Sequence, residues 1–429
     1  MDNYKTYDTY KPSGVEWLGD VPAHWKALRG TYVFKIINER SKKGQEELLS
    51  VSEHHGVRPR SVSNVNMFMA ESYEGYKLCY PGDLVINSLW AWSRGLGFSK
   101  YKGIVSTAYS VYRADHINYD VTYLNYLLRI ENYVAQYLIA SRGIWISRLL
   151  LSDWSFLRLP ILTPPKEEQT RIANLLDEKT ALIEKGIEIK QKQIELLKER
   201  RQILIHNAVT RGLNPHVKMK QSGVEWIGEI PEHWEVKRLK DICLLNIDSL
   251  AENTKADYEF KYVDISSVNL QNGIFQTEDY TFKNAPSRAR RIAKEGNTII
   301  STVRTYLKAI DFIDNEKSSY IYSTGFAVLQ PKKSIYPQFL AYFVRSDAFT
   351  EQVTVNSKGM SYPAINSTDL SRLTIVHCGW EEQKEIVSYI ETMSSKISTA
   401  ISFKEKEIER LREYKATLIN SVVTGKVKI

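Results

Sequence analysis

Two distant stretches of the chain repeat one pattern of apolar and polar positions. They cover residues 166–210 and 380–424, and Gln169 of the first aligns with Gln383 of the second. In each stretch apolar residues recur at spacings of three, four and seven, while Lys, Glu, Arg and Gln fill most other positions. This period predicts a long amphipathic helix with a coiled-coil seam. The first seam comprises Ile172, Leu176, Ile183, Ile187, Ile194, Leu197 and Leu204, and the second comprises Ile386, Ile390, Ile397, Ile401, Ile408, Leu411 and Leu418.

Both helices are expected to begin at the same signal. Residues 167–169 and 381–383 share a Glu-Glu-Gln run, and Pro164 and Pro165 precede the first of them. Proline at a helix start and acidic residues in the first turn are typical of helix N-termini. A helix of this length, ~65 Å at 1.5 Å per residue, needs a partner for its apolar stripe. The matching registers favour an antiparallel pair, and the alternative is that each helix is buried against its own globular domain.

The remaining sequence has a different pattern. Short apolar, β-branched runs bounded by Gly, Pro and Asn predict strands, for example at residues 83–87 and 297–301. Helical stretches are expected near Tyr123–Ala140 and Tyr336–Phe349. The fold class is therefore α/β (α+β), with two similar globular domains separated by two long antiparallel coiled-coil helices in an internal repeat. The expected boundaries are 1–163 for the first domain, 164–212 for the first helix, 213–378 for the second domain and 379–429 for the second helix.

Thirteen residues near the start recur after the first predicted helix. Ser13–Trp25 and Ser222–Trp234 are identical at nine positions and differ mainly by Leu/Ile, Asp/Glu and Val/Ile exchanges. One large module is therefore present twice. The repeat contains His24 and His233 beside a tryptophan, which we interpret as packing and hydrogen-bonding elements. We expect each copy to join a helix end to a globular domain.

Net charge, cysteine usage and the absence of long apolar runs indicate which classes of protein the chain could belong to. The 58 basic and 50 acidic residues give a net charge of +8, which is compatible with nucleic-acid binding but common among other proteins. The three cysteines are far apart, which argues against a disulfide framework or a zinc site. The first residues lack an apolar signal-peptide stretch, and no run reaches the ~18 apolar residues of a membrane span. We expect an intracellular protein in a reducing compartment, without a membrane span.

Motifs for catalysis are absent from the sequence. There is no GxxxxGK[ST], no dinucleotide fingerprint, no HExxH and no GxSxG. The adjacent pair His54 and His55 lacks metal-ligand spacing and is interpreted as a polar loop. We therefore predict no catalytic and no metal site in this chain.

Loops that mix cations with aromatic residues are the candidate functional sites. Arg and Lys neutralise phosphates, and Arg can read base edges in the major groove. For each loop taken singly, an ordinary solvated loop is the favoured interpretation. The recurrence of an Arg/Lys-Gly loop at Arg142 and Lys358 favours a functional one. The candidate DNA-binding residues are Arg58, Arg60, Trp92, Arg94, Lys100, Lys102, Arg142 and Trp145 in the first domain, and Arg288, Arg290, Arg291, Arg304, Tyr306, Lys308, Lys358 and Tyr362 in the second.

The order of variable domain, long helix, variable domain and long helix resembles the specificity (S) subunits of type I restriction-modification systems. Residues 164–172, which read PPKEEQTRI, are similar to the start of a helical region in that family. The second copy departs from this motif, because Cys378-Gly379-Trp380 replaces the prolines. Residues 263–269, 286–291 and 301–304 look like one type of target recognition domain, and residues 90–97 resemble its counterpart in other members.

The resemblance implies a location, partners and a division of labour. The chain would be cytoplasmic in a prokaryote and associated with the nucleoid. Each domain would read one half of a bipartite site in double-stranded DNA, and the helices would set the spacer. Two methyltransferase (M) subunits would dock on the helix pair through the seam residues, and restriction (R) subunits would join the full complex. S-adenosylmethionine, ATP and Mg²⁺ would then belong to partner subunits and no cofactor to this chain. The alternatives are a specificity subunit for a fused methyltransferase-nuclease and a stand-alone DNA-binding or regulatory protein.

Overall fold

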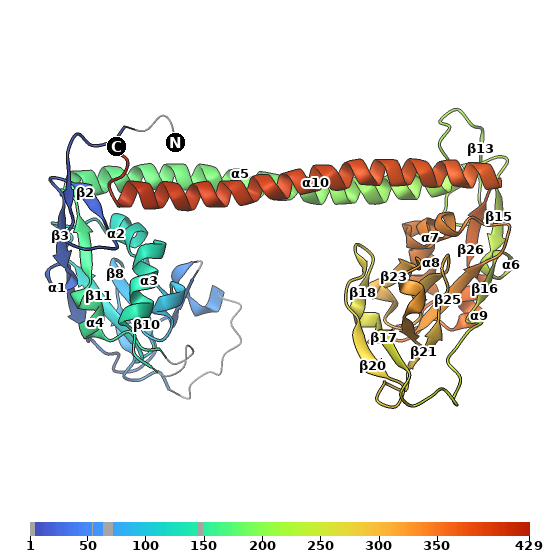
Figure 1. Cartoon of the computed structure of the whole chain (residues 1–429), viewed down its shortest axis with the longest axis horizontal. Coiled ribbons are helices and arrows are strands. Elements are labelled where there is room, and N and C mark those ends of the chain that lie inside the picture. Colours follow the sequence, from blue (N-terminus) through green and yellow to red (C-terminus); the bar gives the residue numbers. More distant parts are fainter. Residues whose placement is uncertain (1–4, 54, 63–71, 144–148) are drawn as a thin grey trace. The chain divides into compact units, whose positions relative to one another are not determined.

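The computed structural model describes residues 5–53, 55–62, 72–143 and 149–429. Contacts divide the chain into two compact units, and each combines one globular domain with part of both long helices (Figure 1). The first unit comprises Met1–Lys190 and Lys406–Ile429, and the second comprises Gln191–Glu405. The prediction of two β-rich domains and two long packed helices is confirmed.

A four-stranded antiparallel sheet is the centre of the first domain, in the order β4-β11-β8-β9. Its strands are β4 (Phe34–Ile37), β11 (Tyr109–Ala114), β8 (Asp83–Asn87) and β9 (Leu96–Phe98). The other strand pairs are β1 (Tyr10–Pro12) with β2 (Asp20–Pro22), β3 (Lys26–Arg29) with β12 (Pro160–Thr163), β5 (Leu49–Ser52) with β6 (Gly56–Pro59), and β7 (Lys77–Cys79) with β10 (Gly103–Val105). The helices are α1 (Gly30–Val33), α2 (Val121–Leu127), α3 (Glu131–Ala140) and α4 (Asp153–Arg158), with 3-10 turns η1 (Arg60–Val62) and η2 (Ala91–Ser93).

The second domain repeats this sheet as β16-β25-β22-β23 and adds another. The repeated strands are β16 (Cys243–Leu245), β25 (Phe326–Pro331), β22 (Thr298–Ser301) and β23 (Ile310–Phe312). The added sheet has the order β20 (Glu278–Thr281), β17 (Glu259–Val263), β24 (Ile321–Ser323) and β21 (Ala289–Ile292). Further pairs are β13 (Met219–Gln221) with β14 (Glu229–Pro231), β15 (Glu235–Arg238) with β26 (Thr374–His377), and β18 (Val268–Asn269) with β19 (Gly273–Ile274). The helical elements are α6 (Leu239–Ile242), α7 (Pro337–Arg345), α8 (Asp347–Asn356), α9 (Ser367–Arg372), η4 (Ile265–Ser267), η5 (Thr305–Leu307) and η6 (Lys317–Ser319).

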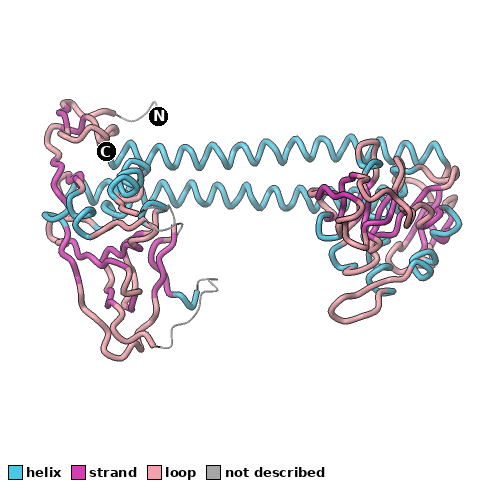
Figure 2. Tube along the Cα trace, turned by 60° about the horizontal axis from the view of Figure 1, so that its bottom comes forward, coloured by secondary structure: helices cyan, strands magenta, loops and turns pink. Residues whose placement is uncertain are grey.

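Two long helices, α5 (Lys166–Arg211) and α10 (Trp380–Val423), lie side by side (Figures 1 and 2). Two ion pairs of the first unit establish their direction: Glu184 contacts Lys415 at 2.6 Å, and Lys190 contacts Glu407 at 2.9 Å. Rising residue numbers on α5 therefore meet falling numbers on α10, so the helices are antiparallel. Of the predicted seam residues, Ile187, Leu197, Leu204, Ile401 and Leu411 are half-buried and the others are buried.

The start of each long helix is fastened to its own domain by a buried glutamine. The Gln169 side chain accepts a hydrogen bond from the Asp120 amide at 2.9 Å and donates to the Pro164 carbonyl at 2.8 Å. Gln383 repeats this arrangement with Tyr336 at 2.6 Å and Cys378 at 2.7 Å. Asp120 and Tyr336 are the N-caps of α2 and α7. The Glu-Glu-Gln signal therefore does more than start a helix, because its glutamine connects two helix N-termini.

The thirteen-residue repeat lies at helix ends, as expected. His24 contacts Glu168 at 2.8 Å, and His233 contacts Glu382 at 3.1 Å, so each copy holds the first turn of a long helix. The same copies pack on the glycine that follows the other helix. A Cβ on Gly425 would lie 2.4 Å from Pro22, and one on Gly212 would lie 3.1 Å from the Trp234 ring.

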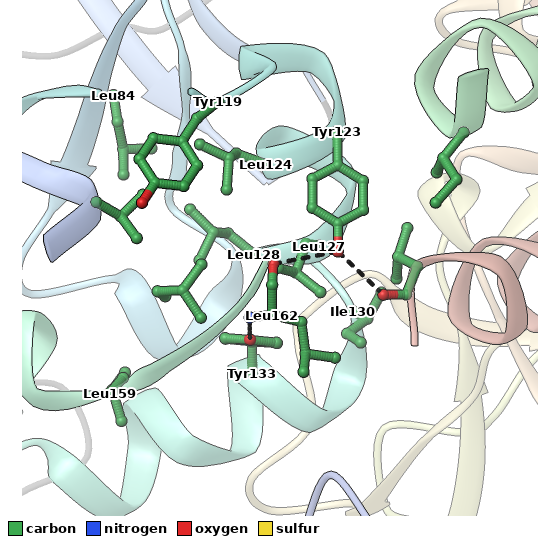
Figure 3. Packing of buried hydrophobic residues seen from close by; sticks show 14 of the residues in the cluster. Leu84, Tyr119, Tyr123, Leu124, Leu127, Leu128, Ile130, Tyr133, Leu159 and Leu162 are labelled. Atoms are coloured by element: carbon green, nitrogen blue, oxygen red, sulfur yellow. Dashed lines mark hydrogen bonds between the residues drawn. The ribbon is translucent and has the colours of Figure 1, made fainter. Parts of the chain in front are cut away.

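A tyrosine-rich core connects the helix ends to the first domain. The buried Tyr123 hydroxyl lies 3.2 Å from the Leu162 carbonyl and 3.3 Å from the Val423 carbonyl (Figure 3). Tyr133 donates to the Pro160 carbonyl at 2.9 Å. These hydroxyls satisfy carbonyls of β12 and of the last turn of α10, which would otherwise be buried without a partner.

The helical stretches predicted near residues 123–140 and 336–349 are each two helices. Ile130 and Ser346 interrupt them with extended backbone, at ψ of 156° and 158°, and act as N-caps of α3 and α8. At the first break, the Tyr137 hydroxyl donates to the Leu128 carbonyl at 2.8 Å. The period of apolar residues does not reveal this break in the helix. A tertiary hydrogen bond satisfies a carbonyl that the break leaves without its helical partner.

The glycine contact at the end of α10 predicts a stability difference. Gly425 has φ of +73° and Gly14 has φ of +75°, but only Gly425 has neighbours within 4 Å of a Cβ position. We expect Gly14→Ala to cost about 1 kcal/mol through left-handed strain alone. Gly425→Ala should cost a further ~1–3 kcal/mol because its methyl group overlaps the Pro22 ring. Urea unfolding of the full chain measures both, and equal shifts would contradict the proposed contact.

Candidate nucleic-acid interface

The third strand of the repeated sheet leads into the same turn in both domains. We define this turn loop as residues 88–94 and 302–308. Each contains a single 3-10 turn, η2 or η5, that is closed by a cation in left-handed conformation: Arg94 at φ 55° and Lys308 at φ 46°. Equivalent backbone hydrogen bonds run from Asn87 to Gly95 at 2.8 Å and from Ser301 to Ala309 at 2.9 Å. The turn and its closing hydrogen bond therefore recur, although the side chains differ and the residue before the 3-10 turn has φ of −125° at Trp90 and 51° at Arg304.

A second loop lies against the turn loop in each domain. We define this basic hairpin by the described residues 141–143 and 149–151 in the first domain and by residues 357–365 in the second. Its closing bridges pair Arg142 with Leu150 and Lys358 with Ala364. The hairpin is attached to the turn loop by a hydrogen bond from Leu151 to Ser88 at 3.0 Å, and by one from Ile365 to Thr302 at 2.8 Å. Long-range pairing thus brings together two loops that are far apart in sequence.

Ion pairs hold the left-handed cations in place. Arg94 contacts Glu53 at 3.3 Å and also Glu131, the first residue of α3. Lys308 contacts Asp347, the first residue of α8, and Glu351, each at 3.4 Å. Acidic residues in the first turn of a helix are favoured by its dipole, so each pair connects the turn loop to a helix start.

The structure brings about half of the sequence-predicted residues into these loops. Those in the second domain are Arg304, Tyr306, Lys308, Lys358 and Tyr362, and those in the first are Trp92, Arg94 and Arg142. Arg304 and Lys358 are exposed, and the Arg304 guanidinium lies 5.2 Å from the centre of the Tyr362 ring. In the first domain the Trp90 and Trp92 rings stack with centroids 5.5 Å apart. Trp145 lies outside the described residues.

The other predicted residues lie on different elements. Arg58 is in β6 and Arg60 in η1, while Lys100 and Lys102 follow β9, with Lys102 5.7 Å from the Tyr80 ring centre. In the second domain, Arg288, Arg290 and Arg291 lie in or just before β21 of the added sheet.

The three arginines near β21 have different environments. Arg288 is exposed, and Arg290 lies 4.6 Å from the Phe282 ring centre. Burial lowers the pKa of the Arg291 guanidinium from its ordinary value, and its Nε has no hydrogen-bond partner among the described residues. Arg291 is therefore the least accessible of the three to a phosphate.

An exposed apolar stripe on α5 was not predicted from the sequence. Leu182, Ile189, Leu196 and Ile203 follow one another at intervals of seven residues and expose 58, 50, 54 and 52% of their surface. On α10, Phe403 is 62% exposed. The heptad spacing of these residues is visible in the sequence, but the seam residues of α5 have the same period. Only the packing against α10 shows which of the two rows is buried and which is exposed.

Two other kinds of site, a membrane-spanning helix and a metal site, are absent from the described residues. None of the helices among them is long and apolar enough to cross a membrane. Within the same residues, no group of three or more His, Cys, Asp or Glu side chains is placed to hold a metal ion.

Comparisons with known proteins agree on one family. Residues 231–410 match the family model described as the type I restriction modification DNA specificity domain. The chain is 26% identical over 339 residues to the MjaVIII type I restriction enzyme specificity subunit of Methanocaldococcus jannaschii, covering 76% of this chain and 75% of that protein. It is 23% identical over 207 residues to the EcoKI specificity subunit of Escherichia coli, covering 47% and 44%.

Solved structures share the fold. A chain from a structure on complex assembly and conformational transition of a type I restriction-modification system superposes with a TM-score of 0.68 at 15% identity, covering 94% of this chain and 98% of that one. The specificity subunit of Thermoanaerobacter tengcongensis superposes with a TM-score of 0.55 at 15% identity, covering 95% and 98%.

Proposed function

The chain belongs to the specificity subunits of type I restriction-modification systems, the non-catalytic DNA-recognition subunits of these complexes, and we propose that each of its globular domains reads one half of a bipartite DNA site. The observation that carries this proposal is the recurrence of the turn loop and basic hairpin on one backbone framework with different side chains. A constant framework with variable loops suits two readers of unlike sequences.

The two loop sets offer different chemistry to DNA. The second domain presents the exposed cations Arg304 and Lys358 beside Tyr306 and Tyr362, whereas the first presents Trp90 and Arg142. Exposed Arg and Lys can contact phosphates or the O6 and N7 acceptors of guanine. Arg94 and Lys308 are already paired with carboxylates, so we assign them to shaping the loops and leave DNA contacts to their exposed neighbours.

Exchanging residues 26–160 for another recognition domain tests the division between the domains. We expect one half-site to change and the other to stay, because the second loop set is untouched. Mapping of methylated bases in a host that carries the hybrid and the methyltransferase subunits measures the outcome. A change in both halves, or in neither, would refute one domain for each half.

The helix pair is proposed to set the number of unread base pairs. The 46 residues of α5 form one uninterrupted helix, whose length at 1.5 Å per residue is roughly 69 Å. Its antiparallel packing against α10 makes the pair stiffer than a single helix or a flexible linker. A stiff element of fixed length suits a site with a defined spacer.

Lengthening both helices tests this role. Seven residues inserted after Lys190, with seven before Glu407, preserve the heptad seam and add ~10 Å. That length corresponds to about three base pairs at 3.4 Å each. We expect unchanged half-sites with a longer spacer, read from the methylated sequences. Methylation with the original spacer would contradict the proposal.

The exposed stripe is proposed to receive helices of two methyltransferase subunits. It replaces the seam residues that the resemblance implied for docking, because those are buried or half-buried in the helix pair. Its heptad spacing is that of a coiled-coil seam, and exposed apolar side chains in such a row need a helical partner. Lys and Glu residues flank the stripe, as they flank interhelical seams elsewhere. The internal repeat of the chain supports two copies of the partner, although the stripe itself is not repeated on α10, where the equivalent positions are Lys396, Phe403, Arg410 and Thr417.

Charged substitutions on the stripe should prevent this assembly. Ile189→Glu with Leu196→Glu removes two apolar contacts worth ~1.5 kcal/mol or more each. We expect at least about 100-fold weaker binding of the methyltransferase subunits, measured by native mass spectrometry and titration. The control is Glu188→Ala with Glu195→Ala, which alters neighbouring exposed positions and should leave affinity unchanged. Equal affinities for the two double variants would exclude the stripe as the docking surface.

Methyl transfer and cleavage are assigned to other subunits. Methyltransferase subunits would bind S-adenosylmethionine and take the target base out of the duplex, and restriction subunits would use ATP and Mg²⁺. The mass of the purified complex separates this arrangement from a fused methyltransferase-nuclease partner or a stand-alone DNA binder, because each requires a different set of chains.

A further inference from the structure

The turn loops expose large apolar side chains in both domains. Trp90 is 48% exposed and Leu89 38%, while Tyr306 is 57% exposed and Leu307 37%. Each helix next to a turn loop also exposes an apolar side chain near its C-terminal end. Ile139 and Val355 are the ninth residues of α3 and α8, and their exposed fractions are 73 and 61%. Trp90 is the N-cap of η2 and Tyr306 is the second residue of η5, so the two rings occupy the same loop at different positions. Exposed apolar groups on the same loop of two divergent domains indicate a common contact.

Each turn loop is also unusually well fixed for an exposed loop. The backbone is closed by its own hydrogen bonds, attached to the basic hairpin and joined to a helix start through Arg94 or Lys308. The Trp90 ring is supported by Trp92, whose indole nitrogen donates to the Leu89 carbonyl at 2.9 Å. An aromatic side chain held in this way loses little conformational entropy on binding.

Cations lie beside the aromatic groups. Arg142 in the first domain and Arg304 with Lys358 in the second are exposed on the turn loop or the basic hairpin next to it. An aromatic group flanked by cations suits a duplex, whose phosphates border the stacked bases. Side chains of this type can enter a base step and unstack it, at a cost of a few kcal/mol.

We propose that Trp90 in the first domain and Tyr306 in the second act as wedges that unstack one base step in each half-site. The inference rests on the proposed function and deepens it, because the specificity subunit would then deform the DNA as well as read it. Unstacking next to a target base lowers the energy needed to extrude that base. The wedge would also select steps that unstack easily, which is a form of indirect readout.

Fluorescence of 2-aminopurine tests the inference, because its emission rises when the base loses its stacking neighbours. The probe is a duplex with the host's mapped methylation sequence, in which 2-aminopurine replaces one non-target purine at a time. The protein is the full chain in complex with its methyltransferase subunits. We expect at least one position in each half-site to rise several-fold on binding.

Variants then assign each rise to its wedge. Trp90→Ala should abolish the rise in one half-site only, and Tyr306→Ala the rise in the other only. Trp90→Phe keeps an aromatic ring and should retain most of the signal. Tyr32→Ala is the matched control, since Tyr32 is 73% exposed on α1, outside the turn loop, and its loss should change nothing. Thermal unfolding of each variant checks that the fold is intact.

The possible outcomes separate the inference from the function beneath it. Tight binding with no rise at any position, or a rise that survives Trp90→Ala and Tyr306→Ala, overturns the wedge and leaves the DNA-reading function standing. Loss of methyltransferase subunits from the Trp90→Ala complex also overturns it, because the aromatic surface would then be a protein contact. A wild-type complex that binds no such duplex overturns the proposed function itself.

Discussion

The fold depends on the buried amide of a glutamine at the start of each long helix. Gln169 and Gln383 are almost fully buried, and each satisfies an amide donor and a carbonyl from two other segments. Such a group has no low-energy alternative, because any shift would leave buried polar atoms unpaired. The orientation of each helix start relative to its own domain is therefore fixed. The repeat adds a contact from His24 or His233 to the glutamate just before the glutamine.

This fixed frame allows the loops to vary. Leu151 and Ile365 attach the basic hairpins by the same backbone hydrogen bond, so side chains can change without loss of loop position. The first domain has aromatic stacking where the second has Arg304 over Tyr362. Backbone contacts are insensitive to side-chain identity, which is why one scaffold can hold two different recognition surfaces.

Periodicity predicted the two long helices, because seam residues such as Ile172 and Ile386 recur over many turns. The predicted strands at 83–87 and 297–301 also correspond to β8 and β22. Long-range features were not predictable from sequence. The ion pairs of Arg94 and Lys308 depend on residues distant along the chain. The stripe at Leu182 and Ile189 has the same heptad spacing as the seam, so the sequence alone does not show that it is exposed.

That uncovered stripe has a consequence for how the cell makes this protein. If Leu182 and its heptad neighbours are covered only in the complex, every chain synthesised in excess of its partners exposes a row of apolar side chains to solvent. Such chains would associate with each other or be degraded. The abundance of the recognition subunit would then follow that of its partners. The exposed apolar face of α5 would therefore require that the subunits be synthesised in balanced amounts.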